Sequence, residues 1–310
     1  KSNQIEDKLI GCASILLVGL CYQNEKNYLS FGTSLLKKIS KQTLDNNGFP
    51  KSRNIRQLIL YLKYFILIRE WFKESQINIP EHIDETIYYL GQGYAFFRRN
   101  FNSSFLFNGN NISDDVEFNN YLKRLGYKFK NENNELGGYI YFNDKKIDLV
   151  MDVGSTPSMD FTKNYQSGAL SFEILSNGKK LISNSGYYKK KNSKLNNLSK
   201  SSAAQSTLII DDNSSCKFVD VNQSLLIKRG LKIIKKAHVF EKNYWKINAS
   251  HDGYIKKYNS IHEREIEFFP DQMTFVGLDK IIKKKTNHNY KFDIRFHLEP
   301  SVKLMKTQDN

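Results

Sequence analysis

The sequence predicts an α+β multidomain protein in which N-terminal helical hairpins precede a large antiparallel β-sandwich. In roughly the first hundred residues, apolar side chains recur at three- and four-residue spacing, as they do on one face of an α-helix. From Gly137 onward, short strand-forming runs follow one another without helical segments between them, as in stacked antiparallel sheets. We therefore expect a helical domain over residues 1–100, a linker with one short helix over 101–136 and a sandwich domain over 137–310.

The helical part is expected to contain helices joined by short loops. They are expected at residues 5–21, 28–39, 55–73 and 81–98. Gly48 and Pro50 mark the polar stretch before the third helix as a loop. Pro80 is expected in the first turn of the fourth helix, where its missing N–H needs no partner. Short connections between helices favour antiparallel hairpins.

The strand-forming runs of the sandwich are bounded by Asn, Asp and Gly. Examples are residues 138–142, 146–153, 168–175, 179–186, 206–212, 224–234, 244–252, 264–269, 273–279 and 290–298. Asn177 and Gly178 separate two alternating runs and predict a tight β-hairpin. The polar, charged tract at 187–202 is expected to be a loop.

The net charge of +15 raises the question of a nucleic-acid partner. Arg occurs nine times against 38 Lys (47 basic residues minus 9). Arginine is the residue that binds phosphates and bases through two parallel hydrogen bonds, so its scarcity argues against specific nucleic-acid recognition. The charge still favours acidic polysaccharides, because it steers them toward the protein.

Composition also bounds the class of protein. No run approaches the roughly 18 apolar residues of a membrane span, so no transmembrane segment is predicted. The chain begins at Lys1 without a signal-peptide pattern, which predicts either a removed leader and upstream segment or a fragment of a longer protein.

Cys12, Cys21 and Cys216 lack CxxC spacing and are expected to be unpaired, with a Cys12–Cys21 bridge as the alternative. The oligomeric state stays open.

Three segments together resemble a known protein family. They are NYQSGALSFEILSNGKKLISNSG at 164–186, SSAAQSTLIIDD at 201–212 and HDGY at 251–254. They resemble the β-rich C-terminal half of the heparinase II/III-like family, which contains bacterial polysaccharide lyases. The resemblance implies an α/α toroid, of which the helical hairpins form a part, followed by a β-sandwich. It also implies an acidic, uronic-acid-containing polysaccharide as partner, a location in the bacterial periplasm or cell envelope, and no cofactor.

Lyases of this kind cleave their glycan by β-elimination. The substrate carboxylate is neutralised, a base removes the adjacent ring proton and an acid protonates the leaving oxygen. In the family, a Tyr of the helical domain and a His of the sandwich transfer the protons. The loop and helix that carry this Tyr resemble residues 44–72, where Arg53 and Asn54 are candidates for substrate binding and Arg56 replaces the Tyr. Tyr61 and Tyr64 lie further along and are either substitutes or core aromatics.

Two family histidines of the sandwich are replaced by glutamines. Gln166 and Gln205 stand where the resemblance leads us to expect His, and Asn184 stands where some relatives carry a zinc-binding Asp. These residues are poor metal ligands, so no metal site is expected. A glutamine cannot act as a general base at neutral pH, but it can hydrogen-bond a uronate carboxylate. Asn108, in a Phe-Asn-Gly segment, is either a cleft residue of this kind or part of a tight turn.

A group of His and Arg residues matches the family more closely. His251 and Tyr254 lie in HDGY, His262 and Arg264 in IHEREI, and His297 in RFHL. The resemblance implies His251, Arg264 and Tyr254 as catalytic residues and His262 as a substrate-binding residue. In the alternative interpretation, the histidines bond backbone carbonyls and Arg264 forms an exposed pair with a neighbouring Glu.

Two functional hypotheses follow from the resemblance. The first is a lyase-related envelope protein that acts on an acidic polysaccharide by β-elimination. The second is a catalytically inactive glycan-binding or envelope-assembly protein on the same scaffold, which the two glutamines favour. A nucleic-acid binder rests on charge alone. Asn3 is a further candidate for neutralising the substrate carboxylate.

Overall fold

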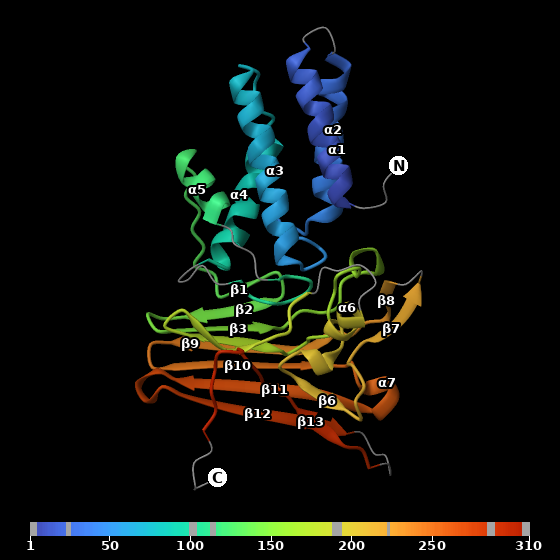
Figure 1. The fold of residues 1–310 in the computed structure, drawn as a ribbon, viewed down its shortest axis with the longest axis vertical. Coiled ribbons are helices and arrows are strands. Elements are labelled where there is room, and N and C mark those ends of the chain that lie inside the picture. The colour runs from blue at the N-terminus through green and yellow to red at the C-terminus, as the bar shows by residue number, and fades with distance from the viewer. Residues whose placement is uncertain are drawn as a thin grey trace. The chain divides into compact units, whose positions relative to one another are not determined.

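The computed structural model describes residues 5–22, 26–98, 104–111, 116–187, 194–221, 224–283 and 289–305. The chain divides into two compact units (Figure 1). Unit 1 comprises residues 1–99 and 113–137, and unit 2 comprises residues 100–112 and 138–310.

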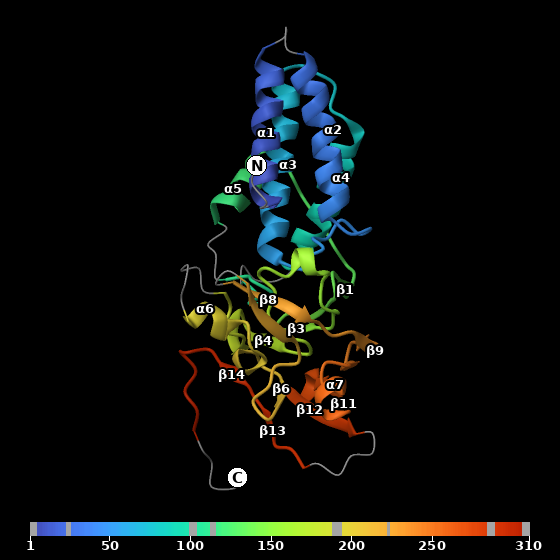
Figure 2. The same cartoon turned by 90° about the vertical axis from the view of Figure 1, so that its right-hand side faces the viewer.

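Unit 1 is a set of helical hairpins (Figure 2). Its helices are α1 (Ile5–Cys21), α2 (Lys26–Thr43), α3 (Ile55–Glu74), α4 (Glu81–Phe96) and α5 (Val116–Arg124), followed by the two-residue strand β1 (Glu135–Leu136). Helix α1 packs on α2, and α3 packs on α4. A Cβ atom on Gly19 would lie 2.6 Å from the backbone nitrogen of Leu29, so glycine permits the close approach of α1 and α2. Pro80 occupies the N-cap of α4, one position before the first turn in which it was expected.

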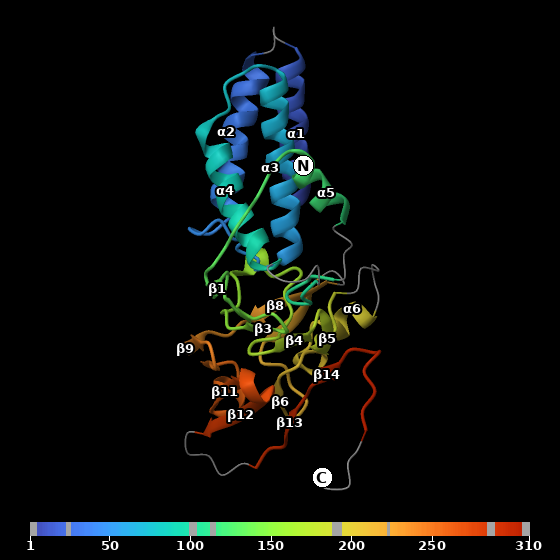
Figure 3. The ribbon, with the colours of Figure 1, turned by 90° about the vertical axis from the view of Figure 1, so that its left-hand side faces the viewer.

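Unit 2 is built on two large antiparallel sheets that lie in stacked layers (Figure 1). Within unit 2 the first sheet runs in the order β2 (Tyr139–Asn143), β3 (Ile147–Asp152), β4 (Phe172–Ser176), β5 (Lys179–Ser183) and β14 (His297–Leu298). The second runs β12 (Thr274–Lys283), β11 (Ser260–Phe269), β10 (Tyr244–His251) and β9 (Ile233–Glu241). Strand β14 returns from the end of the chain to pair with β5 (Figure 3).

Smaller elements complete unit 2. Strand β6 (Leu208–Ile210) pairs with β13 (Phe292–Ile294), and β7 (Lys217–Val221) pairs with β8 (Ser224–Arg229). The short helices are η1 (Met159–Phe161), α6 (Lys194–Ser199), η2 (Ser202–Ala204), α7 (Ile255–Tyr258) and η3 (Pro270–Gln272).

The hydrophobic core of unit 2 lies between the two large sheets. Phe142, Leu149 and Ile174 of the first sheet pack with Trp245 and Phe268 of the second, and all five are buried. Along β11, buried and half-buried residues alternate, because successive side chains of a strand point to opposite faces. The predicted fold class, helices followed by an antiparallel sandwich, is therefore confirmed.

The local predictions hold in part. Asn177 and Gly178 have φ values of 48° and 77° and connect β4 to β5, which confirms the predicted hairpin. The loop expected at 187–202 instead contains α6. The single strand expected at 224–234 is divided between β8 and β9, which belong to different sheets, and β9 continues to Glu241. Strand β9 lies at the edge of its sheet and nearly all of its side chains are exposed, so no alternation of buried and exposed residues marks its length.

The three cysteines are unpaired, with Cys12 and Cys216 buried and Cys21 exposed. Among the described residues, no helix has the length and apolar character needed to cross a membrane.

Candidate functional site

Most candidate residues of unit 2 converge on the segment from Gln205 to Leu208. The Nε2 atom of Gln205 donates to the carbonyl of Ser199 at 2.8 Å. The carbonyl of Ser206 accepts from Nη1 of Arg264 at 2.8 Å, and the carbonyl of Leu208 accepts from the Tyr254 hydroxyl at 3.0 Å. One short segment therefore connects sequence motifs that lie far apart along the chain.

The two glutamines that replace the family histidines are buried side by side. The Nε2 atom of Gln166 donates to the carbonyls of Gly186 at 2.7 Å and of Ser199 at 2.8 Å. Its Oε1 atom accepts from the Gly109 amide at 3.1 Å. Both amide nitrogens, those of Gln166 and Gln205, meet at the same carbonyl of Ser199. The pair therefore ties the end of α6 to two other loops of the sandwich.

Asn184 joins this cluster to a buried carboxylate. Its Oδ1 atom accepts from the Ser206 amide at 2.8 Å, and its Nδ2 atom donates to Oε1 of Glu173 at 3.3 Å. Glu173 is fully buried and also accepts from the Leu106 amide at 3.0 Å, while its Oε2 atom lies 2.8 Å from Nζ of Lys180. Across the described part of the chain, no group of three or more His, Cys, Asp or Glu side chains is arranged to hold a metal ion.

Asn108 lies in a tight turn, and its side chain bonds other residues of the sandwich. With Gly109 it forms a turn, and both have positive φ values, 47° and 86°. Its Nδ2 atom donates to the Tyr139 hydroxyl at 2.7 Å and to Oδ2 of Asp152 at 2.9 Å. The side chain is 2% exposed, so its hydrogen-bonding capacity is directed into the sandwich.

His251, His262 and Asp279 form a buried chain of hydrogen bonds. The Nδ1 atom of His251 accepts from the Gly253 amide at 3.1 Å, so in the neutral ring the proton lies on Nε2. That Nε2 atom lies 3.2 Å from Nδ1 of His262, whose own Nε2 atom lies 2.6 Å from Oδ1 of Asp279. The consistent assignment has each histidine neutral, protonated on Nε2 and donating toward the carboxylate.

Burial and neighbouring charges shift the pKa values of His251, His262 and Asp279. Burial lowers the pKa of His251 well below its ordinary value, and the nearby His262 and Arg264 lower it further. Burial also lowers the pKa of His262, although its hydrogen bond to Asp279 opposes the shift. Burial by itself raises the pKa of Asp279, but hydrogen bonds from His262 and Arg264 outweigh it and hold the pKa at about 2.

Arg264 anchors the other side of Asp279. Its Nε and Nη2 atoms donate to the two carboxylate oxygens of Asp279 at 2.8 and 2.9 Å. Its Nη1 atom donates to the carbonyls of Leu170 and Ser206, and its guanidinium lies 5.4 Å from the centre of the Phe172 ring. The exposed pair with a neighbouring Glu, considered as the alternative, does not form, because alternation along β11 directs Arg264 inward and its neighbours outward.

Tyr254 and His297 bond backbone carbonyls. Tyr254 is 1% exposed, and burial raises the pKa of its hydroxyl far above the ordinary value. The ring of His297 is half-buried, and its Nε2 atom lies 3.0 Å from the carbonyl of Ala203. The Tyr254 hydroxyl, with its raised pKa, therefore holds its proton tightly.

The candidates of unit 1 have their own local roles. Asn54 is the N-cap of α3, where its Oδ1 atom accepts from the amides of Arg56 and Gln57. Arg53 has a positive φ of 59°, and its Nε atom donates to the carbonyl of Gly137 at 3.0 Å. Tyr61 is buried in the helical core, whereas Tyr64 is half-buried. Asn3 lies outside the described residues.

Sequence reasoning missed the acidic partners of this network. Asp279 was not singled out, although pairing β11 and β12 around the turn at η3 places it directly opposite Arg264. Working out the register of this hairpin from the sequence would have placed Asp279 opposite Arg264. Glu173 and Asp152 lie in apolar runs, where an isolated carboxylate indicates a buried partner.

Comparison with known proteins identifies a family and a fold. The family model "Heparinase II/III-like, C-terminal" matches residues 132–310. No curated protein matches the chain. Among solved structures, a heparinase III matches with a TM-score of 0.73 and 15% identity, over 96% of this chain and 50% of that chain. Another heparinase III gives a TM-score of 0.76 and 15% identity, over 97% and 49%.

A heparan sulfate lyase from Pedobacter heparinus gives a TM-score of 0.71 and 16% identity, over 94% of this chain and 47% of that chain. The chain thus spans about half the length of the solved structures it matches. At these identities the likeness is one of fold.

Proposed function

Because this chain belongs to the heparinase II/III-like family, we propose that the protein acts on an acidic, uronic-acid-containing polysaccharide. The family match over the sandwich is the observation that carries this proposal. The net charge of +15 supports it, since a basic protein attracts a polyanionic glycan from a distance. The same membership leads us to propose the bacterial periplasm or cell envelope as its location.

The first candidate activity is cleavage by β-elimination, with His251, Arg264 and Tyr254 as the groups to test. A general base must come within hydrogen-bond distance of the proton that it removes. Both ring nitrogens of His251 are already bonded, and its side chain is 1% exposed. Cleavage through His251 therefore requires this part of unit 2 to open when the glycan binds.

The second candidate is glycan binding without cleavage, and the glutamine pair favours it. Gln166 and Gln205 replace the histidines expected from the resemblance. The amide nitrogens of both side chains already donate hydrogen bonds to backbone carbonyls. An amide provides no general base at neutral pH. We therefore place binding ahead of cleavage for the residues described in unit 2.

One experiment separates the two candidates. The full-length protein is mixed with a panel of uronic-acid polysaccharides, and binding is measured alongside the ultraviolet absorbance of the unsaturated sugar that β-elimination creates. Binding without new absorbance supports a glycan-binding protein. Absorbance that disappears in His251→Gln but persists in His238→Gln, whose histidine is exposed on β9, supports a lyase. Absence of both binding and absorbance across the panel overturns the proposal.

A further inference from the structure

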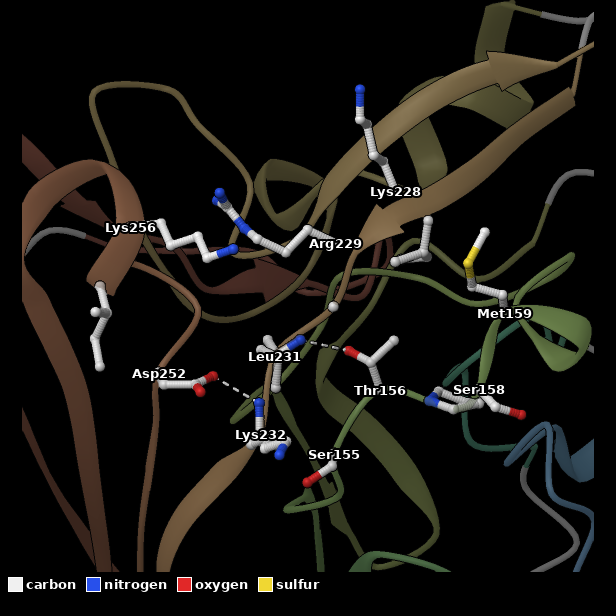
Figure 4. Close-up of a pocket in the computed structure, with 14 residues that line it drawn as sticks. Ser155, Thr156, Ser158, Met159, Lys228, Arg229, Leu231, Lys232, Asp252 and Lys256 are labelled. Carbon is white, nitrogen blue, oxygen red and sulfur yellow. Dashed lines mark hydrogen bonds between the residues drawn. The ribbon is translucent and has the colours of Figure 1, made fainter.

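A cavity of about 590 Å³ lies in unit 2 beside the HDGY motif. Its walls come from the loop after β3, the end of β8 and its connection to β9, and helix α7 (Figure 4). Four cationic side chains line it: Lys228, Arg229, Lys232 and Lys256. All of the lining residues belong to unit 2, so the cavity is complete within this unit.

Hydrogen bonds join the segments that line this cavity. Thr156 and Leu231 are joined twice, through the Thr156 amide to the Leu231 carbonyl at 3.1 Å and the Leu231 amide to the Thr156 hydroxyl at 2.9 Å. The Lys232 amide donates to Oδ1 of Asp252 at 2.6 Å, and the Asp252 amide donates to the Lys232 carbonyl at 3.1 Å (Figure 4). A Cβ atom on Gly230 would lie 2.6 Å from Cβ of Thr156, so the loop packs tightly. These contacts hold the three segments together where they line the cavity.

The acidic side chains that line the cavity do not balance its four cationic side chains. Asp252 is the single acidic side chain among its lining residues, and its Oδ1 atom accepts from a backbone amide. The lining therefore carries four positive charges against one negative charge. Among the described residues, no carboxylate forms an ion pair with any of these four cations. Unpaired cations gathered around a concave surface attract an anionic ligand.

A second cavity, of about 520 Å³, lies beside the same helix and shares Ile255 and Lys256 with the first. It is lined by the aromatic residues Tyr258 and Tyr290, whose ring centres are 5.4 Å apart. The hydroxyl of Tyr258 donates to the carbonyl of Ile210, which fixes the ring. Aromatic faces offer a surface for the apolar faces of sugar rings, and Asn259 and Asn289 add amide groups to the lining.

From these two cavities we propose that unit 2 carries a binding site for an acidic oligosaccharide that runs across helix α7. Arg229 and Lys256 hold its carboxylate or sulfate groups in the first cavity, and Tyr258 and Tyr290 contact a neighbouring sugar in the second. The identity of the ligand rests on the proposed function, whereas the site itself rests on the cavities and their charge. The HDGY motif provides Asp252 at one wall, so this site and the buried histidine chain share one loop.

The test compares two double variants that lose the same charge. Arg229→Gln/Lys256→Gln removes the cations of the cavity, and Lys145→Gln/Lys179→Gln removes two exposed lysines in the hairpins of the first sheet. Binding of a labelled heparin octasaccharide to the full-length protein is measured by fluorescence anisotropy. We expect the cavity variant to raise Kd by about tenfold and the control variant by about twofold, since a local contact costs more than a distant charge. Equal thermal melting temperatures establish that both variants are folded.

A second comparison tests the aromatic part. Tyr290→Ala is expected to weaken octasaccharide binding severalfold, whereas Tyr290→Phe, which retains the ring, is expected to bind like the wild type. Single-stranded DNA of matched charge serves as a competitor. Equal weakening by Arg229→Gln/Lys256→Gln and Lys145→Gln/Lys179→Gln overturns the site, and so does DNA that competes as strongly as the glycan. If the wild type binds no acidic glycan at all, the proposed function fails; if it binds but ignores these substitutions, only this site fails.

Discussion

At the scale of single residues, Asp279 holds the candidate network together. It pairs with Arg264 through two hydrogen bonds and accepts a third from His262, in a region where all three side chains are buried. Removing one member of a buried ion pair leaves the other charged and unpaired, which typically costs about 3–5 kcal/mol.

Asp279→Asn is therefore expected to lower the free energy of unfolding by about 3 kcal/mol. The measurement is chemical denaturation followed by tryptophan fluorescence, because Trp245 lies in the core of the same sandwich. Asp293→Asn is the control, since Asp293 pairs with the exposed Lys291 at 3.5 Å and surface pairs contribute little. A loss below 1 kcal/mol in Asp279→Asn would mean that Arg264 finds another partner.

The two buried histidines predict a loss of stability in mild acid. Their pKa values are lowered on folding, so near pH 6.5 the unfolded chain binds protons that the folded chain does not. Their effect is absent at higher pH and destabilises the fold as the pH falls below about 6.5. The pKa of Asp279, held at about 2, adds a further loss as the pH falls from 3.8 toward that value.

Melting temperatures between about pH 7.5 and 5 measure the histidine contribution. The decrease on acidification is expected to shrink in His262→Gln and to persist in His238→Gln, whose ring is exposed. An unchanged decrease in His262→Gln would contradict neutral burial of this pair.

At the scale of elements, the spacing of glycines along α1 gives a matched test of helix packing. A Cβ atom at Gly19 would lie 2.6 Å from a backbone atom of Leu29, whereas at Gly11 it would meet nothing within 4 Å. Gly11→Ala is expected to stabilise unit 1 by about 0.5–1 kcal/mol, because alanine favours the helix. Gly19→Ala gains the same propensity but clashes, so its melting temperature is expected to fall. If both substitutions stabilise the protein, α1 and α2 can separate without cost.

The sequence allowed the elements to be predicted better than the contacts of the candidate site. The predicted helix at 5–21 matches α1, and the loop predicted from Gly48 and Pro50 ends where Asn54 caps α3, because both depend on local signals. The acidic partner Asp279 depends on the pairing register of β11 and β12. The shared carbonyl of Ser199 depends on how α6 folds within a tract expected to be a loop. Contacts set by tertiary packing are not encoded in local periodicity.

At the scale of the whole molecule, the net charge of +15 and the proposed acidic glycan make association sensitive to salt. A polyanion is attracted over the Debye length, about 10 Å at 0.1 M salt and about 3 Å at 1 M, so added salt shortens the range of steering. The association rate constant for a uronic-acid polysaccharide is therefore expected to fall at least tenfold between about 0.05 and 0.5 M salt.

The dissociation rate is expected to change less, because contacts at short range are screened less than the approach from a distance. Surface plasmon resonance at several salt concentrations measures both rates, with neutral dextran as the control polysaccharide. Arg229→Gln/Lys256→Gln and Lys145→Gln/Lys179→Gln are expected to slow association equally, because each removes two positive charges. Only the former is expected to speed dissociation, because it also removes contacts with the bound glycan. An association rate that does not respond to salt would show that the basic composition plays no part in capturing the glycan, and the proposal would then rest on the family match alone.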